Sequence, residues 1–203
     1  MKIKNVLLIG FSSFFMLACS SSPEEHAKKN EDDTGMAWAE GITCPENWEQ
    51  FVNEFISICF PKEWESDASG LMGSELVLKF VISDTLPDGR EIHPNLNIMK
   101  QPVYELVELG VNNLDEFAEF NKKQLLNFLE DCEIQSFERV QLSETDSYHI
   151  VLRATQMETL MYFDMYMVKS KKYYFAITFT ASAAHADENL DSAREIIKTL
   201  RFS

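Results

Sequence analysis

Residues 173–180 read Tyr-Tyr-Phe-Ala-Ile-Thr-Phe-Thr, the clearest period-two pattern in the chain. The odd positions, from Tyr173 to Phe179, are all large and apolar. The even positions after Tyr174 are an alanine and two threonines. Because successive side chains of a strand point to opposite sides of a sheet, this alternation predicts a strand in a sheet with one covered face.

The neighbouring sequence extends this strand into a sheet. Three segments before it, 133–142, 147–157 and 160–168, read as a meander, and the turn at Lys169 to Lys172 leads into residues 173–180. Further upstream, 48–51 and 55–60 predict a hairpin around Val52-Asn53-Glu54. Residues 75–83 predict a long strand, closed by the turn Leu86-Pro87-Asp88-Gly89 and followed by a returning strand at 95–100.

Two helices are predicted beside the strands. Asn113-Leu114-Asp115-Glu116 has the pattern of a capping box, with Asn113 as N-cap and Glu116 reaching back. The helix that follows keeps one apolar face, formed by Leu114, Phe117, Ala118, Leu125, Phe128 and Leu129. A closing amphipathic helix buries Leu190, Ala193, Ile196, Ile197 and Leu200. The fold class expected is therefore α+β, a mostly antiparallel sheet covered by helices.

One stretch carries a family resemblance. Ile56-Ser57-Ile58-Cys59-Phe60-Pro61-Lys62-Glu63-Trp64 resembles the opening of PsbP-like domains, a fold shared with Mog-type and DcrB-type proteins, in which a hairpin leads into an aromatic-Pro-x-x-Trp corner. The order of later elements over residues 46–203 is similar too, including Asn95-Leu96-Asn97-Ile98 and the last helix. The resemblance implies an αβα sandwich and a binding or assembly role. It transfers no functional residue, because the family shares no active-site motif.

The N-terminus predicts a lipoprotein. Lys2 and Lys4 precede an apolar run from Val6 to Leu17, which is too short for a transmembrane helix of about 20 residues. Met16-Leu17-Ala18-Cys19 resembles a lipobox, so we expect cleavage after residue 18 and diacylglycerol and palmitate on Cys19. The alternatives are plain secretion or an uncleaved anchor. Ser20 after the lipidated cysteine favours the outer membrane by resemblance to sorting patterns.

This signal divides the chain into three predicted segments. Residues 1–18 form the signal peptide, 19–43 a flexible acidic linker without apolar periodicity, and 44–203 one α+β domain. About 160 residues suit a single domain that folds without metal or disulfide.

The charge balance limits the partners. The chain has 33 acidic and 18 basic residues, a formal net charge of −15. Such a surface repels nucleic acid and anionic lipid head groups. Solubility is the simplest reason for it, and a docking face for a basic partner is the alternative.

Cysteines offer the main structural candidates. With Cys19 lipidated, three remain in an oxidising compartment, and a possible disulfide joins Cys44 and Cys59 on either side of the first hairpin. Cys132 then stays unpaired, as a buried residue or a reactive thiol.

No other group forms a recognisable site. The histidines at 26, 93, 149 and 185 lack the spacing of metal ligands or of a catalytic pair, and His149 on a strand reads as hydrogen-bonded at a core edge. Met157, Met161, Met165 and Met167 could ligate Cu(I), but Phe163 shares the face of Met165 and Met167, which is typical of a packed core. The sequence contains no Gly-x-Ser-x-Gly, Walker or His-Glu-x-x-His motif.

These features favour a non-enzymatic envelope lipoprotein that needs no cofactor or metal. Its domain is expected to bind another envelope protein in an accessory, assembly or immunity-type role. The alternative is a periplasmic carrier of a small ligand or of Cu(I).

Overall fold

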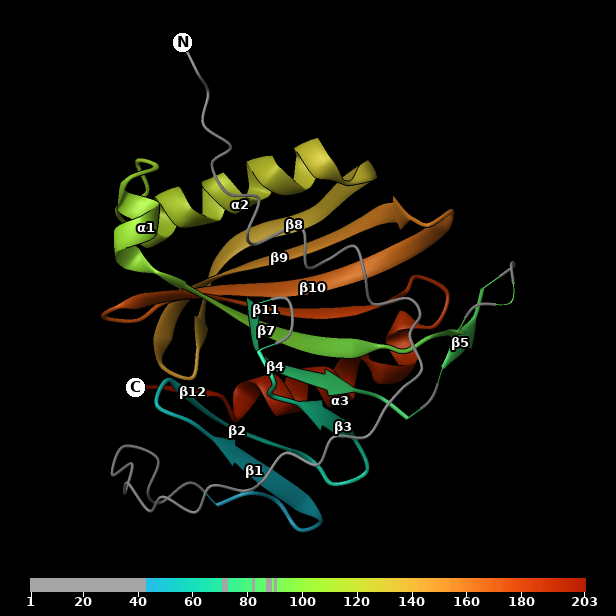
Figure 1. Cartoon of the computed structure of the whole chain (residues 1–203). Coiled ribbons are helices and arrows are strands. Elements are labelled where there is room, and N and C mark those ends of the chain that lie inside the picture. The colour runs from blue at the N-terminus through green and yellow to red at the C-terminus, as the bar shows by residue number, and fades with distance from the viewer. Residues whose placement is uncertain (1–42, 71–72, 82, 87–88, 90) are drawn as a thin grey trace.

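A computed structural model describes residues 43–203, apart from 71–72, 82, 87–88 and 90. Its centre is a seven-stranded, fully antiparallel sheet in the order β3-β4-β7-β11-β10-β9-β8 (Figure 1). The strands are β3 Glu65–Asp67, β4 Ser74–Lys79, β7 Asn95–Pro102, β8 Glu130–Leu142, β9 Thr145–Gln156, β10 Thr159–Lys169 and β11 Tyr173–Ser182.

Smaller elements cover this sheet. The helices are α1 Val103–Val107, α2 Leu114–Phe128 and α3 Ala186–Lys198. A three-stranded sheet, in the order β1-β2-β12, consists of β1 Trp48–Val52, β2 Ile56–Pro61 and β12 Arg201–Phe202, and a separate hairpin pairs β5 Asp84–Thr85 with β6 Glu91–Ile92. The predicted α+β class and the predicted meander are confirmed.

Both faces of the large sheet are buried, which corrects the expectation of one covered face. On β11, Phe175, Ile177 and Phe179 pack toward α3 and β2, whereas Tyr174 packs on the opposite side beneath α2. The even positions Thr178 and Thr180 are buried as well. Figure 1 shows α2 above the sheet, with α3 and the three-stranded sheet below it. The layers therefore form the αβα sandwich that the family resemblance implied.

Two tight turns connect the meander. Leu142 pairs with Thr145 and Gln156 with Thr159, so each hairpin loop contains two residues. All four loop residues have positive φ, namely Ser143 at 49°, Glu144 at 67°, Met157 at 50° and Glu158 at 63°. Two-residue loops with this geometry match the twist of the strands, although glycine and asparagine adopt it more easily. Met157, which the sequence placed in a strand, is therefore a turn residue.

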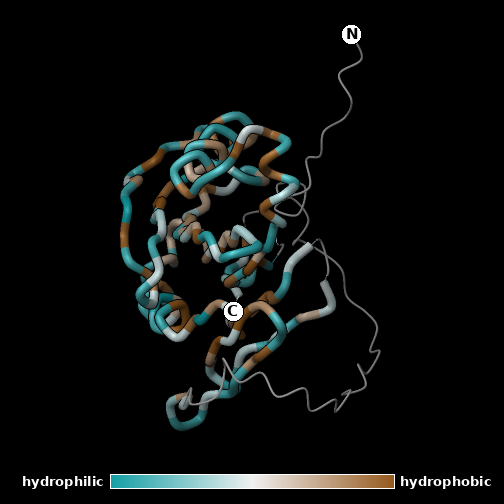
Figure 2. The backbone as a smooth tube through the Cα atoms, turned by 90° about the vertical axis from the view of Figure 1, so that its left-hand side faces the viewer, coloured by the Kyte–Doolittle hydropathy of each residue, from teal (hydrophilic) through white to brown (hydrophobic). Residues whose placement is uncertain are grey.

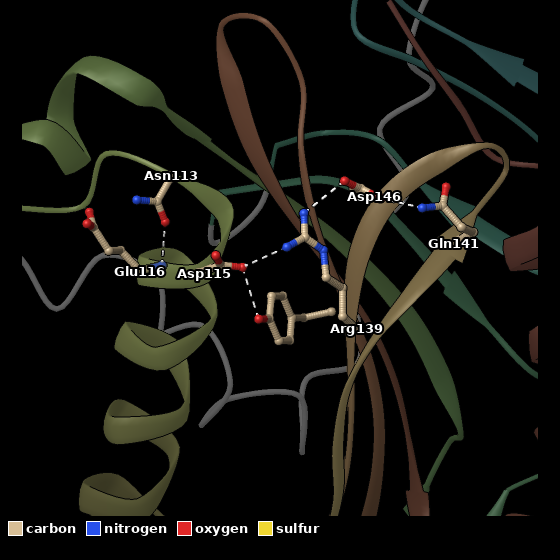
Figure 3. A network of polar contacts seen from close by, with 7 residues as sticks. Asn113, Asp115, Glu116, Arg139, Gln141 and Asp146 are labelled. Carbon is tan, nitrogen blue, oxygen red and sulfur yellow. Dashed lines mark hydrogen bonds and ion pairs between the residues drawn. The ribbon is translucent and has the colours of Figure 1, made fainter.

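The N-terminus of α2 is fixed to the β8–β9 hairpin. The Asn113 side chain accepts a hydrogen bond of 2.9 Å from the Glu116 backbone, which confirms the predicted N-cap, and Glu116 reaches back to the backbone of Asn112. Figure 3 shows Arg139 of β8 between Asp115 of α2, at 3.3 Å, and Asp146 of β9, at 2.8 Å. These charges are about half exposed, so they orient the helix more than they stabilise it.

The three-stranded sheet closes the other layer. Trp64, four residues after Phe60, is buried against Phe80, and its backbone donates to Pro61. The C-terminus returns to the same place, because the Ser203 backbone donates to Phe55 and β12 pairs with β2. Figure 2, turned by 90° from Figure 1, marks this end of the chain with C.

The remaining differences from the sequence predictions are local. The strand expected at 75–83 ends at Lys79, and Gly89, with φ of 84°, closes the separate β5–β6 hairpin instead of joining β4 to β7. Pro87 and Asp88 of that predicted turn lie outside the described residues. Phe128, expected on the buried face of α2, is 40% exposed. Over the described ranges, no helix is long and apolar enough to cross a membrane.

Candidate functional site

A charged network is buried between the sheet and α3. Asp164, in the middle of β10, is fully buried and accepts hydrogen bonds of 3.0 and 2.6 Å from Nε and Nη2 of Arg194 on α3. Its second oxygen lies 2.7 Å from Nε2 of His149 on the neighbouring strand β9. A buried carboxylate needs such partners, because leaving it unpaired in the interior is costly.

One aromatic ring stacks on His149. The Tyr166 ring stacks on the imidazole, with centroids 4.4 Å apart and planes 17° from parallel. On the outer side, Nδ1 of His149 lies 3.8 Å from the carboxylate of Glu138, which is exposed. The network therefore extends from solvent at Glu138 through His149 and Asp164 to Arg194.

Burial and charge act together on the titrating groups here. Desolvation raises the pKa of Tyr166 to about 12, and the nearby negative charge of Asp164 adds to this shift. Burial of Arg194 opposes its charge, but the hydrogen bonds and charge of Asp164 outweigh burial and raise the pKa of the guanidinium. The tyrosine stays neutral and the arginine stays charged at neutral pH, so the arrangement is a structural ion pair with a stacked histidine.

An open pocket lies at one end of the sheet. It has a volume of about 440 Å³ and is bordered by the β9–β10 turn, the β11–α3 turn and the β5 strand. Leu86, Leu160 and the alanines at 183 and 184 form its apolar wall. Its polar lining contains Asp84, Thr85, Arg153, Thr159, Ser182 and His185. The volume falls within the range of small-ligand sites.

Ser182, Asp84 and His185 contact one another in this pocket, but not in the order found in a serine hydrolase. The Ser182 hydroxyl donates to Asp84 at 2.5 Å, and Nε2 of His185 lies 3.8 Å from the other oxygen of Asp84. In a serine hydrolase the histidine stands between serine and aspartate, so that it can take the hydroxyl proton. Here the Asp84 carboxylate lies between Ser182 and His185 instead. A hydrogen bond to Glu188, at 2.8 Å, and the charge of Asp84 raise the pKa of His185.

Among the cysteines, the structure brings together Cys44 and Cys59. They form a disulfide with Cα atoms 5.6 Å apart, which links the residues before β1 to β2. Cys132 is free and half-buried, and burial raises the pKa of its thiol, which disfavours a reactive thiolate. Cys19, the signal peptide and the linker up to residue 42 lie outside the described residues.

Three of the four methionines in the predicted cluster pack in the core. Met161, Met165 and Met167 are buried beside Phe163 beneath α2. Across residues 43–203, excepting the short gaps, no three His, Cys, Asp or Glu side chains come close enough to hold a metal ion.

The charged network was missed from the sequence, although two signals pointed to it. Asp164 interrupts the apolar run from Leu160 to Val168, and Arg194 is adjacent to the apolar stripe of α3. A charged residue at a position expected to be buried requires a partner, and the two breaks in pattern could have been matched.

The fold has counterparts among solved structures. No protein-family model and no curated protein matches the sequence. Cyanobacterial PsbP from Synechocystis aligns with a TM-score of 0.55 at 10% identity, over 80% of this chain and 96% of that one.

Two further structures share the arrangement. LpqN of Mycobacterium tuberculosis, described as involved in cell envelope biogenesis, aligns with a TM-score of 0.55 at 11% identity, over 73% of this chain and 83% of that one. A Pseudomonas aeruginosa protein of unknown function aligns with a TM-score of 0.52 at 7% identity, over 75% and 95% of the two chains. At these identities the likeness concerns the fold alone, and the chain folds into a PsbP-like domain.

Proposed function

We propose that this protein is a non-enzymatic binding domain of the bacterial cell envelope, tethered to the outer membrane by lipid on Cys19, and that it docks onto another envelope protein. The lipobox around Cys19 supports the tether. The similarity of fold to LpqN, described as involved in cell envelope biogenesis, supports the location.

The observation that carries docking is an apolar surface at one end of the sheet, formed by Tyr104, Val107 and Leu109, which we call the α1 tip. These side chains are 69%, 46% and 42% exposed. They account for three of the seven large hydrophobic side chains that are exposed among the described residues. Apolar side chains that gather at one place on a soluble domain commonly mark an interaction site.

Charged residues of both signs surround the α1 tip. The exposed Lys171 and Lys172 lie next to α1, because the Val103 backbone donates to the Lys172 carbonyl at 2.9 Å. Glu108, also exposed, lies within the tip itself. An apolar centre with a polar rim is the anatomy of a protein–protein interface. The partner suited to it is a protein with an apolar patch and its own mixed charges.

The buried polar groups support a binding role over catalysis. Asp164 binds both Arg194 and His149, and the Ser182 hydroxyl donates to the Asp84 carboxylate. These groups hold α3 and the β5–β6 hairpin in place.

The test is crosslinking and affinity capture of the tagged protein from its own envelope. Val107→Glu with Leu109→Glu should remove the dominant captured protein. Leu126→Glu is the matched control, because Leu126 is 48% exposed on α2, away from the tip. Cys19→Ala should lower the yield and abolish lipid on the mature N-terminus, as read by mass spectrometry.

The docking hypothesis fails if the captured proteins are the same for wild type and the double variant. It also fails if no protein is enriched at near-stoichiometric yield.

A further inference from the structure

The pocket at the other end of the sheet carries an inference of its own, independent of the α1 tip. The tip adjoins the β10–β11 turn, whereas this pocket adjoins the β9–β10 turn, so the length of β10 separates them. We propose that the pocket binds a small zwitterion with an apolar body, of the class of free hydrophobic amino acids.

The carboxylate of such a ligand has a donor available. Arg153 lines the pocket and is exposed, and no described residue forms an ion pair with it. A guanidinium binds a carboxylate through two parallel hydrogen bonds.

The cationic end has an acceptor in the same pocket. Asp84 receives the Ser182 hydroxyl on one oxygen, and among the described residues its other oxygen has only His185, at 3.8 Å. A carboxylate offers about four lone-pair sites, so Asp84 can accept an ammonium group as well. One pocket thus presents a positive and a negative side chain, which complements a ligand with both charges.

The apolar part of the pocket lining suits an aliphatic or aromatic side chain. Leu160 is 48% exposed at the pocket, and Leu86, also in the lining, is buried. Covering Leu160 would remove apolar surface from water, which favours a ligand with an apolar body. The volume of about 440 Å³ leaves room for such a molecule with bridging water.

Calorimetric titration of the full chain with L-valine, L-leucine and L-phenylalanine tests this proposal. At least one should bind with a Kd of about 1 mM or tighter. For that amino acid, the N-acetyl form lacks the ammonium group and the amide form lacks the carboxylate. Each should bind about tenfold more weakly.

Variants locate the site. Arg153→Gln and Asp84→Asn should each weaken binding about tenfold, whereas Lys123→Gln, at an exposed lysine of α2 outside the pocket lining, should leave binding unchanged. Arg153 is exposed, so its variant keeps the fold, which circular dichroism checks.

Three outcomes would overturn the proposal. These are the absence of binding by all three amino acids, equal binding of the N-acetyl form, and binding that is insensitive to Arg153→Gln. None of them bears on capture of an envelope protein through the α1 tip.

Discussion

The two faces of the seven-stranded sheet are both buried, yet their chemistry differs. Beneath α2, the strands present Met161, Phe163, Met165 and Met167, which pack with aliphatic side chains of β9. Beneath α3, the same strand β10 presents the charged Asp164 between two tyrosines. Alternate residues of one strand therefore belong to two different kinds of core.

The difference indicates how each helix is held. α2 covers an apolar surface of flexible thioethers that can fit many shapes, and its position is set at its end by the Asn113 cap and the Arg139 contacts. α3 is fixed through its middle, because Arg194 must meet Asp164 to satisfy a buried charge. A buried ion pair adds little net stability. Removal of one partner, however, leaves an unpaired charge and is strongly destabilising, so the pair constrains where α3 can lie.

The largest effect is expected from Phe163→Ala, which tests the α2 face. Phe163 is fully buried, so its truncation should lower the free energy of unfolding by about 4 kcal/mol through lost burial and a residual cavity. Urea denaturation measures this. Met165→Leu on the same face conserves volume and should cost less than about 1.5 kcal/mol. Similar losses from both variants would contradict a well-packed α2 face.

Asp164→Ala tests the α3 face at the adjacent residue. It leaves Arg194 and His149 without their common partner and should lower the free energy of unfolding by about 3 kcal/mol. The value lies at the low end for buried pairs, since the Arg194 side chain is 36% exposed and can turn to water. A cost below about 1 kcal/mol would mean that the network does not position α3.

Removal of the disulfide tests whether the α3 face depends on its small covering sheet. Cys44→Ser with Cys59→Ser opens a loop with a sequence separation of 15 residues and should cost about 2–3 kcal/mol. Reduction of the wild type should reproduce the loss in thermal denaturation. Unchanged stability after verified reduction would show that β1 and β2 hold by their packing alone.

The smallest effect is a pH dependence specific to the α3 face. The raised pKa of Tyr166, about 12, favours the neutral phenol in the folded state. Its contribution is fully present below the unfolded pKa of about 10 and is lost as pH rises from about 10 to 12. Tyr166→Phe should therefore lose stability less steeply than wild type above pH 10. Identical slopes for the two proteins would place Tyr166 in contact with solvent.

Much of the fold could be predicted, because strands and helices leave periodic patterns. The alternation at 173–180, the Asn113 cap and the apolar stripe of α3 all correspond to observed elements. The elements that were missed are short. β3, β12 and the five-residue α1 contain too few residues to show a period. β12 in addition forms by pairing with β2, which lies far away in the sequence.

Less of the candidate sites than of the fold could be predicted from the sequence. The Cys44–Cys59 pair could be predicted because the two cysteines lie on either side of the first predicted hairpin, and the structure joins them in a disulfide. Asp164 and Arg194 are 30 residues apart, and Asp84 and Ser182 are 98 apart. No spacing rule relates such pairs, because their distance is set by strand register and helix placement.

By itself, the sequence determined the α+β class, the order of the principal strands and helices, the acidic surface and the expectation of lipid on Cys19. These depend on properties that act locally, namely side-chain periodicity, turn chemistry and charge. Only the tertiary structure decided that a buried carboxylate joins β10 to α3 and that a pocket opens at one end of β10. Those features arise from contacts between residues far apart in the chain, which pack against each other only once the layers have formed.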